Sequence, residues 1–534
     1  MALYRHQWLH TNAINTNYTY TSPRGEMRVF AGSSFYTDMT FHGVLPAFPD
    51  AGSYDRNRLY QYVDDIYTNG PFINSKDSYW GGKDAGRLSQ LVWIADQVGH
   101  IAARDTFLTH IKDALEDWFD ADDEGSRLLY YDSTWDVLIP FPTGYGVNTE
   151  INDHDFHHGY WLMAAATVAN FDNTWAQSSN WGGMIELMIR DAACWDRNNS
   201  LFPFLRCMDA YAGHSWASGH SGFAAGNNQE SSSEAMNFNT GIILWGSATG
   251  NTEIRDLGIF LYVNQAAAIN QYWFDVDNAV FPTGFDYETV GILWDNGGAY
   301  ATWWSPEPEE IHGINYLPFT GGSLYLGHNP SYVIRNYNSI VRQNGGEEDF
   351  WQDIIWNYQA FADPAVAINK FENRSFTPED GESLAHIYHW LYNLESLGNV
   401  ETGITSDFPT YAVFNNNNIL TYVAYNPGPS DRTVYFSNGA TLTALAGKIS
   451  TGDGTGNTTP TPITTQNPQA DIGDVNEDGT VNIIDALLVA QYYVGLNPEG
   501  FAVENADTDC SGSVNIVDAL LIAQFYVGLL TGFC

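Results

Sequence analysis

The chain has 534 residues, more than one ordinary hydrophobic core accommodates, so two or more domains are expected. Acidic residues outnumber basic residues by 63 to 21, and the formal net charge of -42 disfavours phosphate backbones and anionic membrane surfaces as partners. Nucleic acid and membrane binding are therefore not expected. Aromatic residues make up 15% of the chain, which is too many for a disordered protein and suits the stacking of rings against neutral ligands such as sugars.

The sequence carries few signals of its compartment. Its first residues, MALYRHQWLH, lack the basic and apolar regions of a signal peptide, and no stretch of about eighteen apolar residues predicts a membrane span. The four cysteines lie as two neighbouring pairs, Cys194 with Cys207 and Cys510 with Cys534. Either pair could form a disulfide in an oxidising compartment, and neither has the CxxC spacing of a zinc site.

The first two segments of the chain differ in composition and in the periodicity of their apolar residues. Residues 1–53 are rich in Thr, Tyr, Phe, Gly and Pro, which favours short strands and turns. Residues 54–404 alternate amphipathic runs with aromatic loops, and this pattern predicts a large, mainly α domain; periodicity alone does not distinguish a closed helical barrel from an open array. Apolar residues recur at helical spacing at Leu88, Leu91, Val92, Ala95 and Val98, at Ile111, Leu115, Trp118 and Phe119, and at Leu384, Ile387, Tyr388, Leu391 and Leu394.

Three further segments follow. Residues 405–449 contain short alternating runs such as ILTYVAY and RTVYF, which predict a small β appendage of the large domain. Residues 450–470 consist mostly of Gly, Thr, Pro and Asn, a composition with little to bury, so a flexible linker is expected. Residues 471–534 then form a separate module.

This module contains an internal repeat. DVNEDGTVNIID at 474–485 matches DTDCSGSVNIVD at 507–518, and an apolar helical run follows each. Calcium takes six to eight oxygen ligands, and an EF-hand loop supplies them from positions 1, 3, 5, 7, 9 and 12, with glycine at position 6. Two complete matches argue against a chance Asp/Asn-rich turn, so two calcium ions are expected. The predicted ligands are Asp474, Asn476, Asp478, Thr480, Asn482 and Asp485 in the first loop and Asp507, Asp509, Ser511, Ser513, Asn515 and Asp518 in the second.

The repeat, with Asp rather than Glu at position 12, resembles the dockerin family. The resemblance implies a small α domain with two EF-hand-like loops that docks, with calcium bound, onto a cohesin domain of a cellulosomal scaffold. In that family, positions 10 and 11 of each loop face the partner, and here they are Ile483, Ile484, Ile516 and Val517. These residues are apolar, unlike the Ser-Thr pair of some dockerins, which leaves the cohesin type open.

Two segments of the large domain concentrate polar groups in apolar surroundings, NDHDFHHGYW at 152–161 and GHSWASGHSGFAAGNNQESSSEAMN at 213–237. In the second, Glu230 and Glu234 are four residues apart, so a helix from Gln229 onward would place both carboxylates on one face of its first turn. Like charges raise each other's pKa and a helix N-terminus lowers it, so such a pair can hold two different protonation states.

Several chemistries fit these segments. Glycoside hydrolysis needs two carboxyl groups on opposite sides of a bond, and Asp153 with either glutamate could supply them. A Glu pair at this spacing is also common on solvated surfaces. His154, Asp155 and His157 could bind a metal, although their spacing matches no familiar three-ligand site. Residues 213–217 partly match the GxSxG nucleophile elbow, but alanine stands in place of the second glycine.

The two segments are similar to the signature segments of glycoside hydrolase family 81, the endo-β-1,3-glucanases, whose usual forms are close to NDHHFHYGY and GHSWASG…KNQESxSEA. The similarity covers about residues 1–446. Supporting matches are YWGGKDAGRLSQLVWIADQVG at 79–99, YDSTWDVLI at 131–139, YATWW at 300–304 and IHGINYLP at 311–318.

The resemblance implies a fold and an activity. The family has an N-terminal β-sandwich, a small linking domain and a C-terminal (α/α)6 barrel, so residues 54–404 are expected to form the barrel and residues 1–53 a β-rich linking segment. Most of the sandwich is then missing, and a truncated start would also remove the signal peptide of a secreted protein. The implied reaction is inverting endo-hydrolysis of β-1,3-glucans such as laminarin, curdlan or callose, without a catalytic cofactor.

The family's site residues are carried over one by one. Asp153 becomes the general acid, Glu230 the general base, and Glu234 a supporting carboxylate that could share the base role. His157, His214, Trp216 and Asn228 would line the sugar site. Asp155 and His158 replace the usual His and Tyr, which brings an extra carboxylate near the acid. A non-catalytic glucan-binding protein and another hydrolase or lyase on the same barrel are the rival interpretations.

Overall fold

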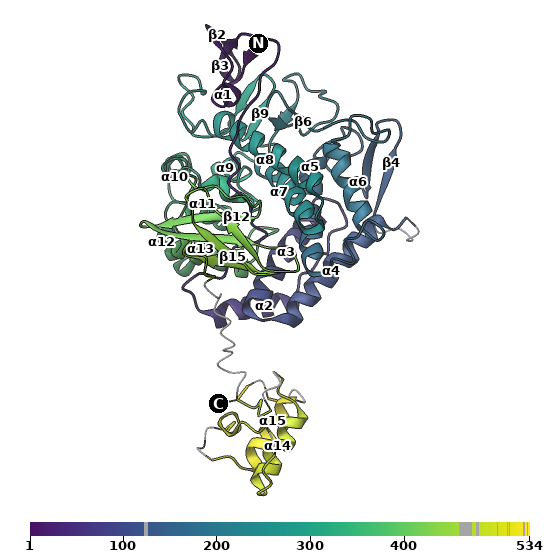
Figure 1. The fold of residues 1–534 in the computed structure, drawn as a ribbon, viewed down its shortest axis with the longest axis vertical. Helices are drawn as coiled ribbons and strands as arrows, with labels where there is room; N and C mark the ends of the chain where they lie inside the picture. The colour runs from purple at the N-terminus through teal and green to yellow at the C-terminus, as the bar shows by residue number, and fades with distance from the viewer. Residues whose placement is uncertain are drawn as a thin grey trace. The chain divides into compact units, whose positions relative to one another are not determined.

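The computed structural model describes residues 1–121, 127–458, 472–476, 480–498, 500–509, 511, 513–526, 529–530 and 532–533. The chain divides into two compact units, Met1–Thr461 and Pro462–Cys534, and each is described by itself. The larger unit is mainly helical, with short antiparallel sheets around the helices (Figure 1). Among the described residues, no helix is both long and apolar enough to span a membrane.

The helices of the larger unit confirm the mainly α prediction and the three periodic segments, which lie in α3, α4 and α13. Each buries its apolar face in one continuous core. The helices are α1 (Arg5–Trp8), α2 (Arg56–Asn69), α3 (Trp80–Val98), α4 (Ile101–Phe119), α5 (His154–Phe171), α6 (Gly182–Ala193), α7 (Ser232–Thr249), α8 (Thr252–Tyr272), α9 (Pro308–Gly313), α10 (Pro330–Asn344), α11 (Gln352–Gln359), α12 (Pro364–Asn373) and α13 (Leu384–Leu397), with the 3-10 helix η1 (Ser323–Gly327).

Helices α5 and α7 lie near the centre of the helical unit (Figure 1). Nearly every side chain of both is buried. Two glycines bring their backbones together: a Cβ atom on Gly159 would lie 2.9 Å from the backbone nitrogen of Phe238, and one on Gly241 would lie 2.9 Å from the Cβ of Leu162. Because the two contacts advance in the same direction along both helices, α5 and α7 run parallel. Their N-termini therefore lie at the same end of the barrel.

Short strands border this end. They pair as the hairpins β4–β5 and β6–β7 and as the three-stranded sheet β10-β9-β8, in which β8 directly precedes α7. The strands are β4 (Leu128–Asp132), β5 (Val137–Phe141), β6 (Met208–Asp209), β7 (His214–Ser215), β8 (Asn228–Gln229), β9 (Ile292–Trp294) and β10 (Gly297–Ala299).

The N-terminal segment is β-rich, as its composition predicts. Strands β1 (Ala2–Leu3), β2 (Asn15–Ser22) and β3 (Gly25–Phe30) form a sheet in the order β1-β3-β2. The predicted boundary at residue 53 does not separate this segment from the barrel, because Val44, Leu45 and Phe48 are fully or almost fully buried in the barrel core.

The β appendage consists of the sheet β11-β12-β13-β16 and the hairpin β14–β15. It extends past the predicted end at residue 449, because Tyr422–Tyr425 pair with 449–452 and Thr455 forms a further bridge to Thr441. The linker was predicted from amino-acid composition, and composition does not reveal that small residues such as these pair through their backbones in a sheet. The strands are β11 (Asn399–Val400), β12 (Tyr411–Asn416), β13 (Ile419–Tyr425), β14 (Arg432–Tyr435), β15 (Thr441–Ala444) and β16 (Ile449–Gly452).

The smaller unit packs α14 (Ile483–Tyr493) against α15 (Ile516–Tyr526), with the short 3-10 helix η2 (Val503–Asn505) between them. Its small core includes Val475, Val489 and Ile522. Of the predicted linker and module, residues 459–471, 477–479, 499, 510, 512, 527–528, 531 and 534 lie outside the described residues.

The cysteines of the first predicted pair are buried, free thiols, so a Cys194–Cys207 disulfide is absent from the structure. Cys194 instead lies beside the backbone of Phe204 in an isolated bridge, and Cys207 accepts a backbone hydrogen bond from Trp216. Cys510 and Cys534 lie outside the described residues.

Candidate active site

The three predicted catalytic carboxyl groups lie at the N-termini of α5 and α7. Asp153 immediately precedes α5 with a left-handed backbone (φ 60°), and its backbone nitrogen donates to Ala217 at 2.9 Å. Glu234 stands in the first turn of α7, and Glu230 precedes the helix. Because the two helices are parallel, the three carboxyl groups lie at the same end of the helix pair. The charges of Glu230 and Glu234 both act on Asp153.

The condition for a shared helix face, a helix that begins at Gln229, is not met. Gln229 belongs to strand β8, and α7 begins at Ser232 with Ser231 as its N-cap, whose hydroxyl accepts from the backbone nitrogen of Glu234 at 3.3 Å. Glu230 and Glu234 therefore do not share a helix face. Glu230 lies in the short connection between β8 and α7, whereas Glu234 lies in α7 itself. Each carboxyl group therefore has its own hydrogen-bond partners.

Glu234 is the most enclosed of the three, with 3% of its surface exposed. The Tyr160 hydroxyl donates to its Oε1 at 2.7 Å. Burial raises the pKa of Glu234, while the hydrogen bonds from Tyr160 and Tyr79 and the charge of Lys83 act in the opposite direction. These groups all favour the ionised form of a carboxyl that burial alone would neutralise.

Glu230 keeps partial contact with solvent, and the backbone nitrogen of Trp303 donates to its Oε1 at 2.8 Å. Burial raises the pKa of Glu230 to about 8, and the neighbouring charge of Glu234 adds to the increase. For Asp153, burial and then Asp155, Glu234 and Glu230 raise the pKa well above its usual range. Burial and the three neighbouring carboxylates therefore favour the protonated form of Asp153.

Aromatic side chains flank the carboxyl groups on both sides. Tyr79 contacts the rings of Trp80 and Tyr145 with centroids 5.1 and 5.3 Å away, and the Tyr145 carbonyl accepts from Asn152, the neighbour of Asp153. Beside Glu230, the Trp303 ring contacts Phe223 at 5.6 Å and Trp294 at 5.4 Å. Trp303 is 55% exposed, so its ring is free to stack against a ligand.

The predicted sugar-binding residues separate into two groups. His157 lies under this site: its Nδ1 pairs with the Ser78 hydroxyl at 2.8 Å, and burial lowers its pKa well below the usual range, so the ring is neutral. His214 is fully buried between the rings of Trp216 and Trp273, at 4.6 and 5.0 Å.

Trp216 is partly exposed, and the Arg24 guanidinium of the N-terminal segment lies over its ring at 5.4 Å. Asn228 is buried in β8, where its carbonyl accepts from the backbone nitrogen of Ala217. Ala217 also accepts from Asp153, so Asn228 and Ala217 carry the backbone that holds the acid in place. A sugar-binding role stays a prediction for all four residues, His157, His214, Trp216 and Asn228.

A buried polar network lies beneath Asp153. Asp191 Oδ2 contacts His154 Nδ1 at 2.7 Å, His158 Nε2 at 3.0 Å and Arg206 Nη2 at 3.0 Å. Burial opposes ionisation of Asp191, but Arg206 and His154 hold its pKa well below the usual range. The cluster of two histidines and a carboxylate has the composition of a metal site, yet the guanidinium already supplies the positive charge that this carboxylate needs.

Several residues of the site were not singled out in the sequence. Tyr79, Trp80 and Lys83 lie in the YWGGKD segment, Tyr160 in the NDHDFHHGYW segment, and Trp303 in YATWW. The family-like segments were the sequence signal that could have pointed to these residues. Each segment contributes at least one contact to a carboxyl group or to its aromatic surroundings. Which side chain of a segment points to the site depends on tertiary packing.

In the smaller unit, the described part of the second loop gathers carboxylates. Oxygen atoms of Asp507, Asp509 and Asp518 lie within 4.8 Å of one another. Asp485 and Asp518 occupy equivalent places and accept backbone hydrogen bonds from Asn482 and Asn515, at 2.8 and 2.7 Å. The predicted ligand Asp478 lies outside the described residues.

The four predicted partner-facing residues are exposed on the first turns of α14 and α15: Ile483 and Ile484 at 51% each, Ile516 at 49% and Val517 at 44%. Leu487 and Leu520, one helical turn further on, are exposed at 56% and 55% and extend the same two apolar faces. The sequence contained these leucines at i+4 spacing, but their exposure depends on which helix faces form the small core.

Comparison with known proteins gives consistent results. Residues 62–391 match the family model of the glycosyl hydrolase family 81 C-terminal domain, and residues 472–525 match the dockerin type I domain. A glucan endo-1,3-beta-D-glucosidase of Thermobifida fusca is 48% identical over 456 residues, 85% of this chain and 60% of that protein. A protein of the same name from Acetivibrio thermocellus is 46% identical over 495 residues, 92% of this chain and 62% of that protein.

A solved structure of a glycoside hydrolase family 81 protein from Clostridium thermocellum superimposes with a TM-score of 0.83 at 47% identity, covering 85% of this chain and 63% of that one. The chain thus spans about three fifths of the length of the relatives it matches. The first family model alone matches more than half of the 534 residues. The helical unit has the (α/α)6-barrel fold, the C-terminal unit is a dockerin, and the chain belongs to glycoside hydrolase family 81.

Proposed function

We propose that the chain hydrolyses internal β-1,3-glucosidic bonds of β-1,3-glucans with inversion of configuration. One observation supports the proposal most strongly. Asp153, Glu230 and Glu234 lie together at the N-termini of two parallel helices, with aromatic rings on either side. Two relatives that are 46% and 48% identical to this chain are named glucan endo-1,3-beta-D-glucosidase, which supports the same substrate class.

In the proposed reaction, Asp153 donates its proton to the glycosidic oxygen while the bond to the anomeric carbon breaks. Glu230 accepts a proton from a water molecule whose oxygen attacks the anomeric carbon from the opposite face. Both protons are accounted for, and the new reducing end has the α configuration. The raised pKa of Asp153 suits the acid, since the group must still hold its proton at the working pH.

The assignment of the two glutamates follows their surroundings. Glu230 is partly exposed, so water can reach it, whereas Glu234 is buried and held by the Tyr160 hydroxyl. We therefore assign the base role to Glu230 and a supporting role to Glu234, whose ionised form favours the protonated form of the acid Asp153. No cofactor is needed for these steps.

The decisive experiment incubates the protein with laminarin and, separately, with cellulose, and follows the anomeric signals of new reducing ends by NMR. Release of β-1,3-linked oligosaccharides with inverted configuration supports the proposal. Retained configuration, or binding of laminarin without any cleavage, would overturn it, and the second result would instead indicate a glucan-binding protein. Asp153→Asn and Glu230→Gln are each expected to lower kcat by about 10²–10⁴-fold, with the exposed Glu253→Gln at the start of α8 as control.

We propose in addition that the dockerin binds two calcium ions and docks onto a cohesin domain, which places the catalytic unit in an extracellular, cellulosome-type assembly. The converging carboxylates of the second loop and the exposed apolar faces of α14 and α15 support this proposal. Calorimetric titration of the whole chain with a cohesin, with and without calcium, tests it. Binding that ignores calcium would contradict it.

A further inference from the structure

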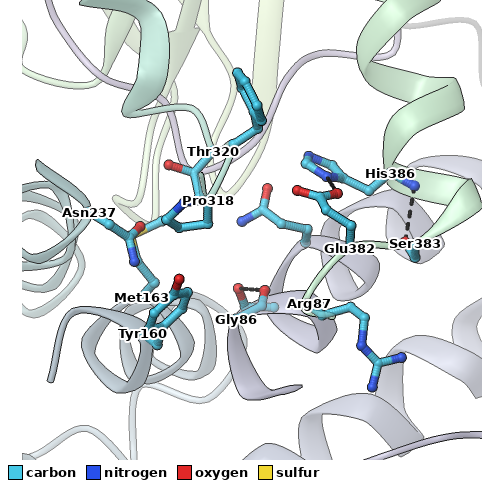
Figure 2. A pocket seen from close by; sticks show the side chains of 14 residues that line it. Gly86, Arg87, Tyr160, Met163, Asn237, Pro318, Thr320, Glu382, Ser383 and His386 are labelled. Atoms are coloured by element: carbon cyan, nitrogen blue, oxygen red, sulfur yellow. Dashed lines mark hydrogen bonds and ion pairs between the residues drawn. The ribbon is translucent and has the colours of Figure 1, made fainter. Parts of the chain in front are cut away.

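A small cavity of about 10 Å³ lies in the barrel core, lined by residues of α3, α5, α7, the 318–320 loop and the start of α13 (Figure 2). Figure 2 shows Tyr160, Asn237 and Glu382 around the same space, and Gln90 lines it as well. All four of these lining residues are almost fully buried. The volume is close to the smallest that holds one water molecule.

Two polar atoms of the cavity wall have no hydrogen-bond partner among the described residues, namely Gln90 Nε2 and Asn237 Oδ1. Their residues are only 6% and 4% exposed, so bulk solvent does not reach them. One is a donor and the other an acceptor, which is the complement that a single water molecule offers. Buried polar groups of folded proteins nearly always find such a partner.

The cavity also adjoins the site described above. Tyr160 forms part of its wall and donates its hydroxyl hydrogen to Glu234 at 2.7 Å. The phenol oxygen can still accept a hydrogen bond, because only its hydrogen is used. The charged and titratable groups that face this space from the surrounding elements are Arg87 on α3, Glu382 before α13 and His386 on α13, and Glu382 pairs with His386 at 2.8 Å.

We propose that the cavity binds one water molecule, which accepts from Gln90, donates to Asn237 and donates to the phenol oxygen of Tyr160. Gln90 and Asn237 are then positioning residues, since they hold the tyrosine that holds Glu234. A hydroxyl that accepts a hydrogen bond becomes a stronger donor, so the water strengthens the bond from Tyr160 to Glu234. The consequence for catalysis rests on the proposed function, whereas the water site itself does not.

The first test is a high-resolution crystal structure of the whole chain. The proposal expects density for one water within about 3.2 Å of Gln90 Nε2, Asn237 Oδ1 and the Tyr160 hydroxyl. A cavity without such density would overturn it, whether or not the protein cleaves glucans. Loss of the proposed activity with the water present would contradict the proposed function alone.

The second test compares Asn237→Leu with Asn239→Leu, a matched loss of a buried amide on the same helix, where Asn239 donates to Gln265 away from the cavity. Asn237→Leu is expected to lower kcat on laminarin about tenfold with little change in KM. Its acidic pH limb is expected to move to lower pH, because Glu234 with weaker hydrogen bonding is more often protonated and then raises the pKa of Glu230 less. Asn237→Ser, which keeps a polar group, is expected to restore most of the rate.

Equal kinetics and equal pH limbs in Asn237→Leu and Asn239→Leu would overturn the positioning role. If Asn237→Leu does not fold, Gln90→Met provides the same comparison from α3, where it removes the donor and keeps the volume. A fall in kcat for Gln90→Met with an unshifted pH limb would likewise contradict the role, since packing alone explains such a loss.

Discussion

Tyr160 on α5 donates a hydrogen bond to Glu234 on α7 at 2.7 Å, and this bond ties together the two helices whose N-termini carry the carboxyl groups. Both side chains are buried. Tyr160→Phe removes the donor without changing the ring, so kcat on laminarin is expected to fall about 10–100-fold. Steady-state kinetics checks this against Tyr262→Phe, a buried tyrosine that donates to the Gly322 carbonyl; equal losses in the two variants would contradict the role of the bond.

The activity is expected to depend on pH through Glu230 and Asp153. Glu230 must lose its proton to act as a base, and its pKa is raised to about 8, so kcat/KM is expected to rise as the pH approaches 8. The rate falls only where Asp153 loses its proton, and the pKa of that group lies well above the usual range. A pH profile on laminarin tests this expectation; a maximum at pH 4–5, where Glu230 is protonated, is incompatible with the assignment.

Stability is expected to respond to the same carboxyl. The pKa of Glu230 is raised from 4.5 in the unfolded chain to about 8 in the folded protein, so the folded state binds the proton more tightly. This contribution is fully present below pH 4.5 and is lost as the pH rises through 8. Glu230→Gln cannot ionise, so it avoids the loss of stability that the buried charge causes at high pH. The substitution is expected to raise Tm at pH 8 but not at pH 4, as measured by calorimetry. A lower Tm at pH 8 would contradict the buried-charge explanation.

The exposed ring of Trp303 is expected to contribute to substrate binding. The backbone nitrogen of Trp303, not its ring, contacts Glu230, so Trp303→Ala leaves that hydrogen bond in place. KM for laminarin is expected to rise about tenfold, equivalent to about 1.4 kcal/mol, with a smaller change in kcat. Tyr435→Ala, an exposed ring on β14, is the control. An unchanged KM would show that the ring lies outside the sugar path.

Calcium removal is expected to affect the dockerin and spare the barrel. Chelation with EDTA leaves the carboxylates around Asp518 without a counterion, so the small core of this unit loses its support. Hydrolysis of soluble laminarin by the same sample is expected to continue. In a calcium titration, Asp518→Asn is expected to reduce two bound ions to one, while the exposed Asp453→Asn keeps both. Two ions in Asp518→Asn would contradict the ligand assignment.

The helices that sequence predicted best are those in which apolar and polar residues alternate at helical spacing. Helix α4 does so because one side of it faces solvent, whereas α3 and α13 are buried on most sides and keep the spacing through buried polar residues such as Gln90 and His386. Helices α5 and α7 are buried on almost every side, so their apolar residues show no period. The fold class came from the former, whereas the centre of the barrel was assigned through family resemblance.

The start of α7 shows what local sequence could have supplied. Ser231 followed three residues later by Glu234 matches a capping-box pattern, which predicts a helix beginning after Ser231 rather than at Gln229. The contact between Trp303 and Glu230 is of another kind, because 73 residues separate them. Only the assembled sheet of β8, β9 and β10 brings that loop to the carboxyl, and no local pattern encodes it.

The glycine contacts between α5 and α7 limit how this chain can change. Since any side chain at Gly159 or Gly241 would collide with the facing helix, the close spacing of α5 and α7 depends on glycine at both positions. Changes of substrate preference are therefore expected in the surrounding loops, such as those that carry Phe223 and Trp303, while the helical pair stays the same. Library designs that vary these loops and leave the pair untouched would explore new specificities without disturbing the chemistry.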